Sequence, residues 1–413
     1  MNETLRAPTR AAFAFIFITV LLDMLAFGLV VPILPRLVVR FEGGNTADAA
    51  AILGLFGTVW AVMQLFFSPV LGALSDRFGR RPVVLLSNLG LGLDYVVMAL
   101  APNVGWLFVG RVISGITSSS FSTAGAYIAD VTPPDRRAAR FGMLGVAFGI
   151  GFIVGPAVGG LLGSIDLRAP FAVAAALSLA NFAYGVFVLP ESLPRERRAP
   201  FHPRAANPIG ALAFLRARPG VVALAAAAFL AGLAHDVLPN LFVLYTDYRF
   251  GWDERTVGLA LALVGLSSMV VQGLVVGRVV AALGERRALA TGLVIGIAGL
   301  AIFGLAPTSA LFALGIPVWA MFGLVMPSLQ GLVTRRVSAT EQGRLQGALG
   351  SIRAVASVTA PILFTQVFAA SVGGSLAGAP FLLGAALLVG SLLLTSRDRG
   401  STASVGATSG AVG

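Results

Sequence analysis

The chain has 413 residues, of which 57% are hydrophobic and 11% are charged, with a net charge of +11 and a mean hydropathy of +0.90. A soluble protein carries roughly 25% charged residues, so this composition excludes a soluble binding module and indicates a membrane protein. Its long apolar runs have to form helices, because no water in a bilayer is available to backbone polar groups. The absence of cysteine excludes disulfide and thiol chemistry.

The basic residues, 29 in all and every one an arginine, are distributed unevenly along the chain. Most of them lie in alternate loops and in the tails, and few lie in the loops between. The positive-inside rule therefore places the arginine-rich loops and both termini in the cytoplasm. The net positive charge is therefore explained by the membrane topology. No nucleic-acid partner is expected.

Twelve apolar runs are long enough to cross a membrane as helices. They lie at about 11–39, 50–74, 82–101, 104–128, 140–164, 169–190, 220–247, 254–283, 287–306, 309–334, 342–371 and 376–396. The longest polar break divides them six and six, which predicts an all-α membrane protein with two pseudo-symmetric six-helix bundles. The expected units are an N-terminal bundle at 1–190, a cytoplasmic linker at 191–219, a C-terminal bundle at 220–396 and a disordered cytoplasmic tail at 397–413.

A charged turn, Gly72–Pro82, separates the second run from the third. Asp76 is a carboxylate at a helix end among Arg77, Arg80 and Arg81. Such a carboxylate can pair with an arginine, or with the N-terminus of the eleventh run, in one conformational state only, so we interpret the turn as a gate. The pattern Gly-x-Leu-x-Asp-Arg-x-Gly-Arg-Arg resembles the signature between helices 2 and 3 of the major facilitator superfamily of transporters.

Two carboxylates in the first half lie near the middle of apolar runs. Each ionisable group at that depth costs on the order of 2.5–3.5 kcal/mol on insertion into the membrane. We therefore expect each one to have a functional or structural role. Asp23 and Asp94 are not comfortably ionised together in a low dielectric, which predicts a role in proton coupling. Arg111 is the cation inside an apolar run of the same half, and its expected partner is Asp23 or Asp94. It could take part in proton coupling or form a structural ion pair, and both interpretations remain open.

The second half carries His235 and Asp236 in the seventh run and Arg353 in the eleventh. Adjacent residues of a helix point about 100° apart, so His235 and Asp236 are not expected to face the same spot. We therefore expect His235 to line a cavity or to make a satisfied polar contact, and not to carry protons.

The fourth and fifth runs carry rows of small residues, which predict tight helix packing. The fourth run has a small or polar stripe on one helical face, formed by Arg111, Gly115, Ser118, Ser122 and Gly125. The fifth run has glycines four residues apart, and its segment Gly151–Gly160 resembles the motif of proton-coupled antiporters in the superfamily. The residues of this motif are Gly151, Gly155, Pro156, Gly159 and Gly160.

The resemblance narrows to the tetracycline-resistance branch of drug:proton antiporters. It is carried by Leu22-Asp23, Gly28-Leu29, Pro32-Ile33-Leu34-Pro35, Leu93-Asp94-Tyr95, the segment Gly110–Thr117, Ile128-Ala129-Asp130, Arg249-Phe250-Gly251-Trp252 and Leu345-Gln346-Gly347. The resemblance implies that Asp23 and Asp94 handle protons and substrate. It also implies that Asp76 gates the conformational change and that Asp130 caps the fourth span beside it.

The chain departs from this branch in its second half. Gly296 and Ser268 stand where the efflux pumps carry a carboxylate and often a histidine, and Asp236 and Arg353 are present instead. The resemblance therefore implies efflux but leaves the drug open. Tetracycline is expected to be a poor substrate unless Asp236 has taken over from the missing carboxylate.

We expect the substrate site to be an apolar cavity near the midplane, between the two halves. Its expected lining is Gln64, Asp94, Arg111, Ser118, Ser122, His235, Asp236, Phe242, Gln330 and Arg353. Carboxylates in an apolar cavity favour amphiphiles that carry a cation or that arrive as a metal chelate. No cofactor and no metal of its own are expected, so magnesium enters only within a chelated substrate.

The predicted function is proton-coupled export of tetracycline-like or other amphiphilic drugs across the inner membrane of a bacterium, by alternating access. The alternative is a transporter of an endogenous amphiphile such as a lipid, a peptide or a metabolite. No HExxH, GxSxG or phosphate-loop motif is present, so an enzyme is not expected. The expected partners are a small amphiphile, the proton and membrane lipid, with the monomer as the working unit.

Overall fold

The computed structural model describes residues 9–117, 120–198, 219–338 and 341–397. The described residues form helices and short connections, without a strand. Ten helices are long and apolar enough to cross a membrane, and Val104–Thr117 is a shorter apolar helix. The predicted all-α membrane fold is confirmed. Most of the expected linker and nearly all of the expected tail lie outside the described residues.

The first half of the chain contains the first six predicted runs. Its helices are α1 (Thr9–Val30), α2 (Leu34–Phe41), α3 (Thr46–Phe78), α4 (Arg80–Leu100), α5 (Val104–Thr117), α6 (Ser120–Val131), α7 (Arg137–Gly163) and α8 (Ala169–Val188), with short 3₁₀ turns η1 (Pro134–Arg136) and η2 (Arg195–Arg197). The first run is divided because Pro32 lies in the turn between α1 and α2, where proline interrupts helical hydrogen bonding. The fourth run comprises α5 and α6.

The second half contains the other six runs. Its helices are α10 (Pro219–His235), α11 (Val237–Phe250), α12 (Glu254–Val270), α13 (Val276–Leu305), α14 (Ser309–Ala320), α15 (Val325–Thr334), α16 (Gln342–Ser371) and α17 (Ala379–Arg397), with a π-helical turn η4 (Val271–Val275) and a 3₁₀ turn η5 (Met321–Leu324). The eighth and ninth runs lie in a helical segment of 52 residues that contains a kink. Gly284 divides it, because its φ of 76° is not helical and suits glycine.

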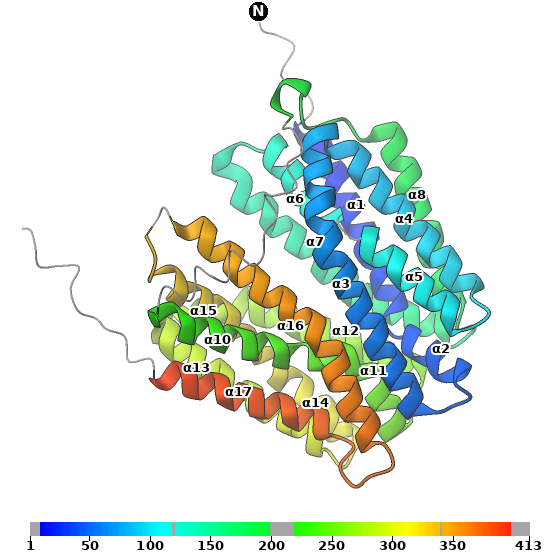
Figure 1. Ribbon diagram of the computed structural model, residues 1–413, viewed down its shortest axis with the longest axis vertical. Helices are drawn as coiled ribbons and strands as arrows, with labels where there is room; N and C mark the ends of the chain where they lie inside the picture. Colours follow the sequence, from blue (N-terminus) through cyan, green and yellow to red (C-terminus); the bar gives the residue numbers. More distant parts are fainter. Residues whose placement is uncertain (1–8, 118–119, 199–218, 339–340, 398–413) are drawn as a thin grey trace, which may run out of the picture.

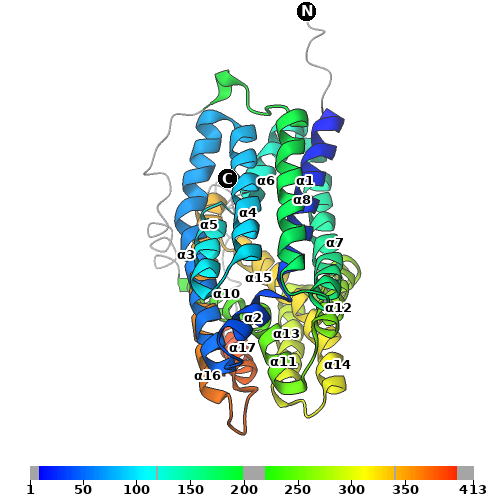
Figure 2. The same cartoon turned by 90° about the vertical axis from the view of Figure 1, so that its right-hand side faces the viewer.

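The two halves form separate groups of helices that cross at an angle (Figures 1 and 2). They contact one another mainly where α3 packs on α16 and where α7 packs on α12. In Figure 1, α3 and α16 lie together at their lower ends and diverge toward their upper ends. We call the end with closely packed halves the Arg36 end and the opposite end the Gly79 end, after residues described below.

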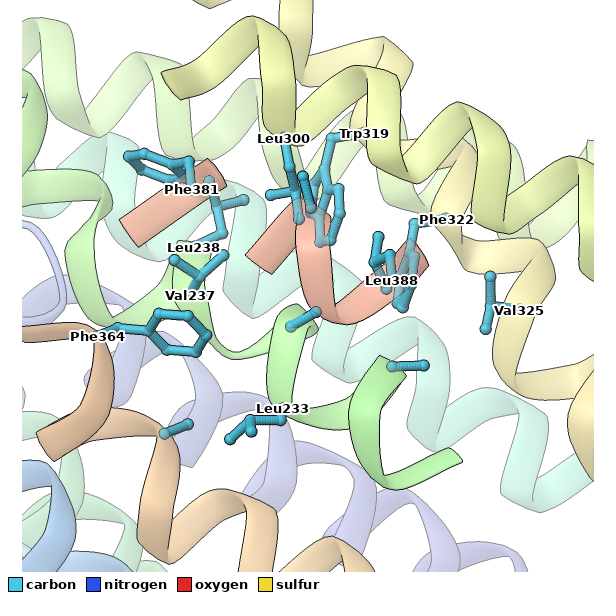
Figure 3. Packing of buried hydrophobic residues seen from close by; sticks show 14 of the residues in the cluster. Leu233, Val237, Leu238, Leu300, Trp319, Phe322, Val325, Phe364, Phe381 and Leu388 are labelled. Carbon is cyan, nitrogen blue, oxygen red and sulfur yellow. The ribbon is translucent and has the colours of Figure 1, made fainter. Parts of the chain in front are cut away.

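Each half has its own hydrophobic core. The second half contains the largest cluster, and Figure 3 shows part of it around Leu238, Phe364 and Phe381. Two smaller clusters, one around Phe171 and one around Tyr127, lie in the first half. Large apolar side chains are also exposed on the outer faces of helices, and their contact with acyl chains would be favourable in a bilayer.

Glycines let α7 approach helices of both halves. A Cβ added to Gly155 would lie 2.6 Å from the Cα of Gly28 on α1, and one added to Gly160 would lie 3.0 Å from the Cα of Gly258 on α12. No side chain fits at such distances, so the glycine row does pack tightly, as its spacing predicts. Part of the proposed antiporter motif thus lies at the interface between the halves.

Candidate functional site

The first half holds a buried ion pair between α4 and α5. Asp94 is fully buried, and its Oδ2 lies 3.4 Å from Nη2 of Arg111, which also donates to Sδ of Met98 at 3.5 Å. A Cβ on Gly110 would lie 2.5 Å from Oδ1 of Asp94, so this glycine lets the carboxylate lie against α5. The structure therefore pairs Arg111 with Asp94, one of its two expected partners, and not with Asp23.

Asp23 lies on α1, and its side chain contacts α8. Nδ2 of Asn181 donates to Oδ1 of Asp23 at 3.0 Å and to the carbonyl oxygen of Thr19 at 3.2 Å. Tyr95, which is also buried, lies within electrostatic reach of Asp23, Asp94 and Arg111. Sequence reasoning missed Asn181, although an amide inside an apolar run was a signal for it.

The second half holds a larger polar cluster where α10 meets α11. Oδ1 of Asp236 lies 2.7 Å from Nη2 of Arg353 and 3.3 Å from Nδ1 of His235. Nη1 of Arg353 donates to the carbonyl oxygen of Gly232 at 3.1 Å, and Oγ of Ser357 lies 3.5 Å from Oδ2 of Asp236. The carboxylate of Asp236 is thus paired with a cation of its own half.

The expectation that His235 and Asp236 face different spots is wrong. Helix α10 ends at His235 and α11 begins at Val237, so Asp236 lies at a junction and not inside a regular helix. The 100° separation of adjacent side chains holds only for continuous helical geometry. Because the helix is interrupted, the imidazole and the carboxylate point toward each other.

A cavity of about 450 Å³ lies next to this cluster. It is lined by His235, Ser268, Gln272, Trp319, Ala320, Phe322, Gly323, Met326, Pro327 and Gln330. Trp319 and Phe322 stack with their ring centroids 4.7 Å apart, and the ring of His235 lies 5.7 Å from that of Phe322. The cavity is therefore a mixed aromatic and polar site, with one ionisable side chain in its wall.

The expected substrate residues are only partly brought together. His235 and Gln330 line the cavity, whereas Asp236 contacts His235 and Arg353 contacts Asp236 without being among the lining residues. Phe242 is instead buried in an aromatic cluster with Trp252 and Phe312. Gln64, Asp94 and Arg111 belong to the first half, whereas all lining residues of the cavity belong to the second. Ser118 and the side chain of Ser122 lie outside the described part of the chain.

Sequence reasoning missed Trp319, Phe322, Gln272 and Met326 in the wall of this cavity. An aromatic pair in an apolar run is more often core packing, and Phe322 is indeed 4% exposed. The break between α14 and α15, which turns both rings toward His235, could not be read from the apolar pattern.

The predicted gate residues form one network at the Gly79 end. Arg80 binds Asp76 through Nη1 and Asp130 through Nε, the latter at 3.1 Å. Oγ of Ser192 lies 3.2 Å from Oδ2 of Asp130. Asp130 therefore lies beside the turn, as the resemblance implies, and the described contacts of Asp76 remain within the first half.

Glu191 completes this network, and sequence reasoning missed it. Its carboxylate accepts hydrogen bonds from the backbone N–H groups of Arg80 at 2.8 Å and Arg81 at 3.3 Å, which caps the N-terminus of α4. The guanidinium of Arg81 donates to the carbonyl oxygen of Val186 at 2.6 Å, and Arg77 lies over the ring of Phe78. In the described part of the chain, the guanidinium of Arg80 pairs with two carboxylates, whereas Arg81 binds Glu191 only through its backbone N–H.

The Arg36 end joins the two halves. Arg36 in the first turn of α2 pairs with Glu254 at 2.8 Å and with Asp247 at 3.1 Å, and it also donates to the carbonyl oxygen of Trp252. Nearby, Oγ1 of Thr58 on α3 donates to the carbonyl oxygen of Val358 on α16 at 3.1 Å. These contacts hold the halves together at this end, whereas the gate network at the other end lies within one half.

This architecture, with two helical bundles, paired charges inside each and contacts between them at one end, is typical of secondary transporters. The sequence matches the model of the family described as Major Facilitator Superfamily over residues 16–361 and 224–411. It is 38% identical over 369 residues to the tetracycline resistance protein, class C, of Escherichia coli, covering 89% of this chain and 92% of that protein. The class D protein of Salmonella ordonez is 34% identical over 368 residues, with coverage of 89% and 92%. The chain belongs to the major facilitator superfamily, in its tetracycline-resistance branch.

Solved structures agree with this assignment. The human organic anion transporter MFSD10 (TETRAN) is 26% identical with a TM-score of 0.69, covering 94% of this chain and all of that chain. The nucleoside transporter NupG has a TM-score of 0.78 at 15% identity, covering 94% of this chain and 98% of that chain. The second likeness concerns the fold alone.

Proposed function

We propose that this protein exports amphiphilic drugs in exchange for protons by alternating access across the inner membrane of a bacterium. The observation that carries the proposal is the Asp94–Arg111 pair, which is buried in the first half. In a low dielectric, a carboxylate is stabilised in its charged form by a neighbouring cation, and in its neutral form without one. A movement that separates the pair would therefore couple a conformational change to proton uptake.

The arginine distribution supports placing the Gly79 end in the cytoplasm, together with both termini. The structure would then be the state that receives substrate from the cytoplasm, because the halves are joined at the Arg36 end. The gate network of Asp76, Arg80 and Asp130 would rearrange when the Gly79 end closes. We infer that a single chain performs the cycle, because the cavity and both ion pairs belong to one chain.

The cavity beside His235 supports an aromatic amphiphile as substrate, since the stacked rings of Trp319 and Phe322 form part of its apolar wall. The tetracycline resistance proteins that this chain resembles make tetracycline the first drug to test. Asp236 is paired with Arg353, so it is not free to replace the carboxylate missing at Gly296. Losing a charged contact of that kind costs on the order of 2–5 kcal/mol of binding, so we expect a magnesium chelate of tetracycline to bind weakly.

A second candidate substrate is an anionic amphiphile. The side chain of Arg353 is 47% exposed, whereas that of Asp236 is 10% exposed, so the open part of this ion pair is its cation. The human relative described as an organic anion transporter adds weight to this alternative. An endogenous metabolite or lipid with a carboxylate or phosphate would belong to the same class.

Transport of protons by inside-out vesicles tests the proposal. Addition of an exported drug should release protons from energised vesicles, and Asp94→Asn should abolish the signal. Asp48→Asn is the matched control, because Asp48 is an exposed carboxylate near the start of α3. A panel of cationic, zwitterionic and anionic drugs would separate the two substrate candidates. Undiminished export after an uncoupler collapses the gradient would refute proton coupling.

A further inference from the structure

A second cavity, of about 340 Å³, lies within the second half at the ends of four helices. It is lined by Leu224, Arg286, Arg287, Leu289, Ala290, Leu332, Arg336, Leu392, Thr395 and Ser396. These residues come from α10, α13, α15 with the turn that follows it, and α17. The lining thus combines three guanidinium groups and two hydroxyl groups with leucine side chains, and it includes no carboxylate among the described residues.

The local fold explains why the arginines gather here. The non-helical φ at Gly284 turns the chain immediately before Arg286 and Arg287. Nη2 of Arg286 donates to the carbonyl oxygen of Thr395 at 3.4 Å, which joins α13 to the end of α17. Arg287 is exposed and makes no hydrogen bond or ion pair within the described residues.

The nearest carboxylate in the sequence is held away from this cavity. Oε1 of Glu285 lies 3.0 Å from Nη2 of Arg335, and neither residue lines the cavity. The carboxylate of Glu285 packs against Gly331, where an added Cβ would lie 2.6 Å from its Cδ. Glu285 therefore does not contribute to the cavity wall, where Arg287 makes no ion pair within the described residues.

We propose that this cavity binds the phosphate headgroup of an anionic phospholipid. Arginine suits this ligand because its planar guanidinium binds phosphate oxygens through two hydrogen bonds. Basic pockets between helix ends at the membrane surface have this chemistry. Leu224, Leu332 and Leu392 provide an apolar wall along which the first part of an acyl chain would lie. Free phosphate shares the headgroup chemistry but would make no use of that wall.

This site is separate from the transport site. The two cavities share no lining residue, and Arg286 and Arg287 belong to neither the gate network nor the ion pairs described above. A lipid bound here would contact α10, α13, α15 and α17 at once. We therefore expect it to stabilise the second half without being transported.

The experiment measures binding of short-chain lipids to the purified full chain in a neutral detergent. Dioctanoyl phosphatidylglycerol is the anionic probe, and dioctanoyl phosphatidylcholine and inorganic phosphate are the comparisons, with native mass spectrometry and thermal stability as readouts. We expect saturable binding and stabilisation by the anionic lipid only. Arg287→Gln should weaken this binding about fivefold, and Arg287→Lys should retain most of it.

Arg278→Gln is the matched control, since Arg278 lies on the same helix but outside the cavity. Its affinity for the anionic lipid should equal that of the unchanged protein. Equal binding of the zwitterionic lipid, or equal loss in the Arg278 and Arg287 variants, would overturn the proposal. Displacement of the lipid by millimolar phosphate would identify free phosphate as the ligand and overturn the lipid assignment.

Discussion

At the scale of single residues, each half of the protein holds a carboxylate that is paired with an arginine of the same half. The two pairs differ in exposure. The side chains of Asp94 and Arg111 are 0% and 12% exposed, whereas those of Asp236 and Arg353 are 10% and 47% exposed. The first pair is thus shielded from solvent, whereas the second exposes the guanidinium of Arg353.

The Asp94–Arg111 pair depends on the absence of a side chain at Gly110. Gly110→Ala would place a Cβ 2.5 Å from Oδ1 of Asp94, so the carboxylate has to move away from α5. We expect a stability loss of about 1–3 kcal/mol from overpacking and a strongly reduced proton signal in vesicles. Gly142→Ala is the control, because nothing lies within 4 Å of a Cβ there. Normal proton coupling in a folded Gly110→Ala protein would contradict this role of Gly110.

The second pair can be tested with a double-mutant cycle. Arg353→Gln leaves the Asp236 carboxylate without its guanidinium partner, and Asp236→Asn leaves Arg353 without its acid. Because the two side chains interact, the double variant should lose less stability than the sum of the single variants, by about 0.5–3 kcal/mol. The measurement is unfolding of purified protein in detergent. Additive losses would mean that the pair contributes no coupling energy.

At the scale of elements, the N-terminus of α4 depends on a residue from the end of the first half. Glu191 accepts hydrogen bonds from the N–H groups of Arg80 and Arg81, and the φ of 108° at Gly79 permits the tight turn before them. A carboxylate at a helix N-terminus satisfies free N–H groups and interacts favourably with the helix dipole. The turn before α4, where we predict the gate, is therefore stabilised by a residue that lies more than one hundred positions further along the chain.

Loss of this cap should loosen the turn. Glu191→Ala is expected to cost about 0.5–2 kcal/mol and to accelerate hydrogen exchange at the amides of Arg80 and Arg81. Glu196→Ala provides a control, since Glu196 is an exposed acid in the same connection and makes no described contact with α4. Exchange that is unchanged in the Glu191 variant would show that the cap does not order the turn.

Much of this arrangement follows from local patterns, and the remainder depends on contacts between distant residues. A pair between Arg111 and a carboxylate of its own half was predictable because these charges stand out in apolar runs, but the choice of Asp94 over Asp23 depends on how α1, α4 and α5 pack. The contact of His235 with Asp236 was not predictable, because nothing in the apolar run around them marks the break between α10 and α11. Arg36 resembles any loop arginine until the fold brings Glu254, more than two hundred residues away, to it.

At the scale of the whole molecule, the two halves interact in two different ways. Small residues such as Gly155 and Gly160 permit close packing of helices, which depends on shape. The ion pairs of Arg36 depend on charge and are confined to one end. An alternating-access cycle has to break contacts of this second kind when the Arg36 end opens, since they join residues of opposite halves.

Arg36→Gln should therefore shift the equilibrium toward a state that is open at the Arg36 end. The side chains of Arg36, Asp247 and Glu254 are 14%, 31% and 20% exposed, so their pairs are shielded from solvent only in part. Removing the cation should disfavour the observed state by about 1–3 kcal/mol, or roughly a factor of 5–150 in the equilibrium constant.

Because the protein has no cysteine, spin labels at Ile165→Cys and Ala310→Cys report the distance between the halves without background labelling. The distribution should gain a longer component with Arg36→Gln and remain unchanged with Arg255→Gln, which alters an exposed arginine near the same loop. Identical distributions in all three proteins would mean that packing alone closes this end.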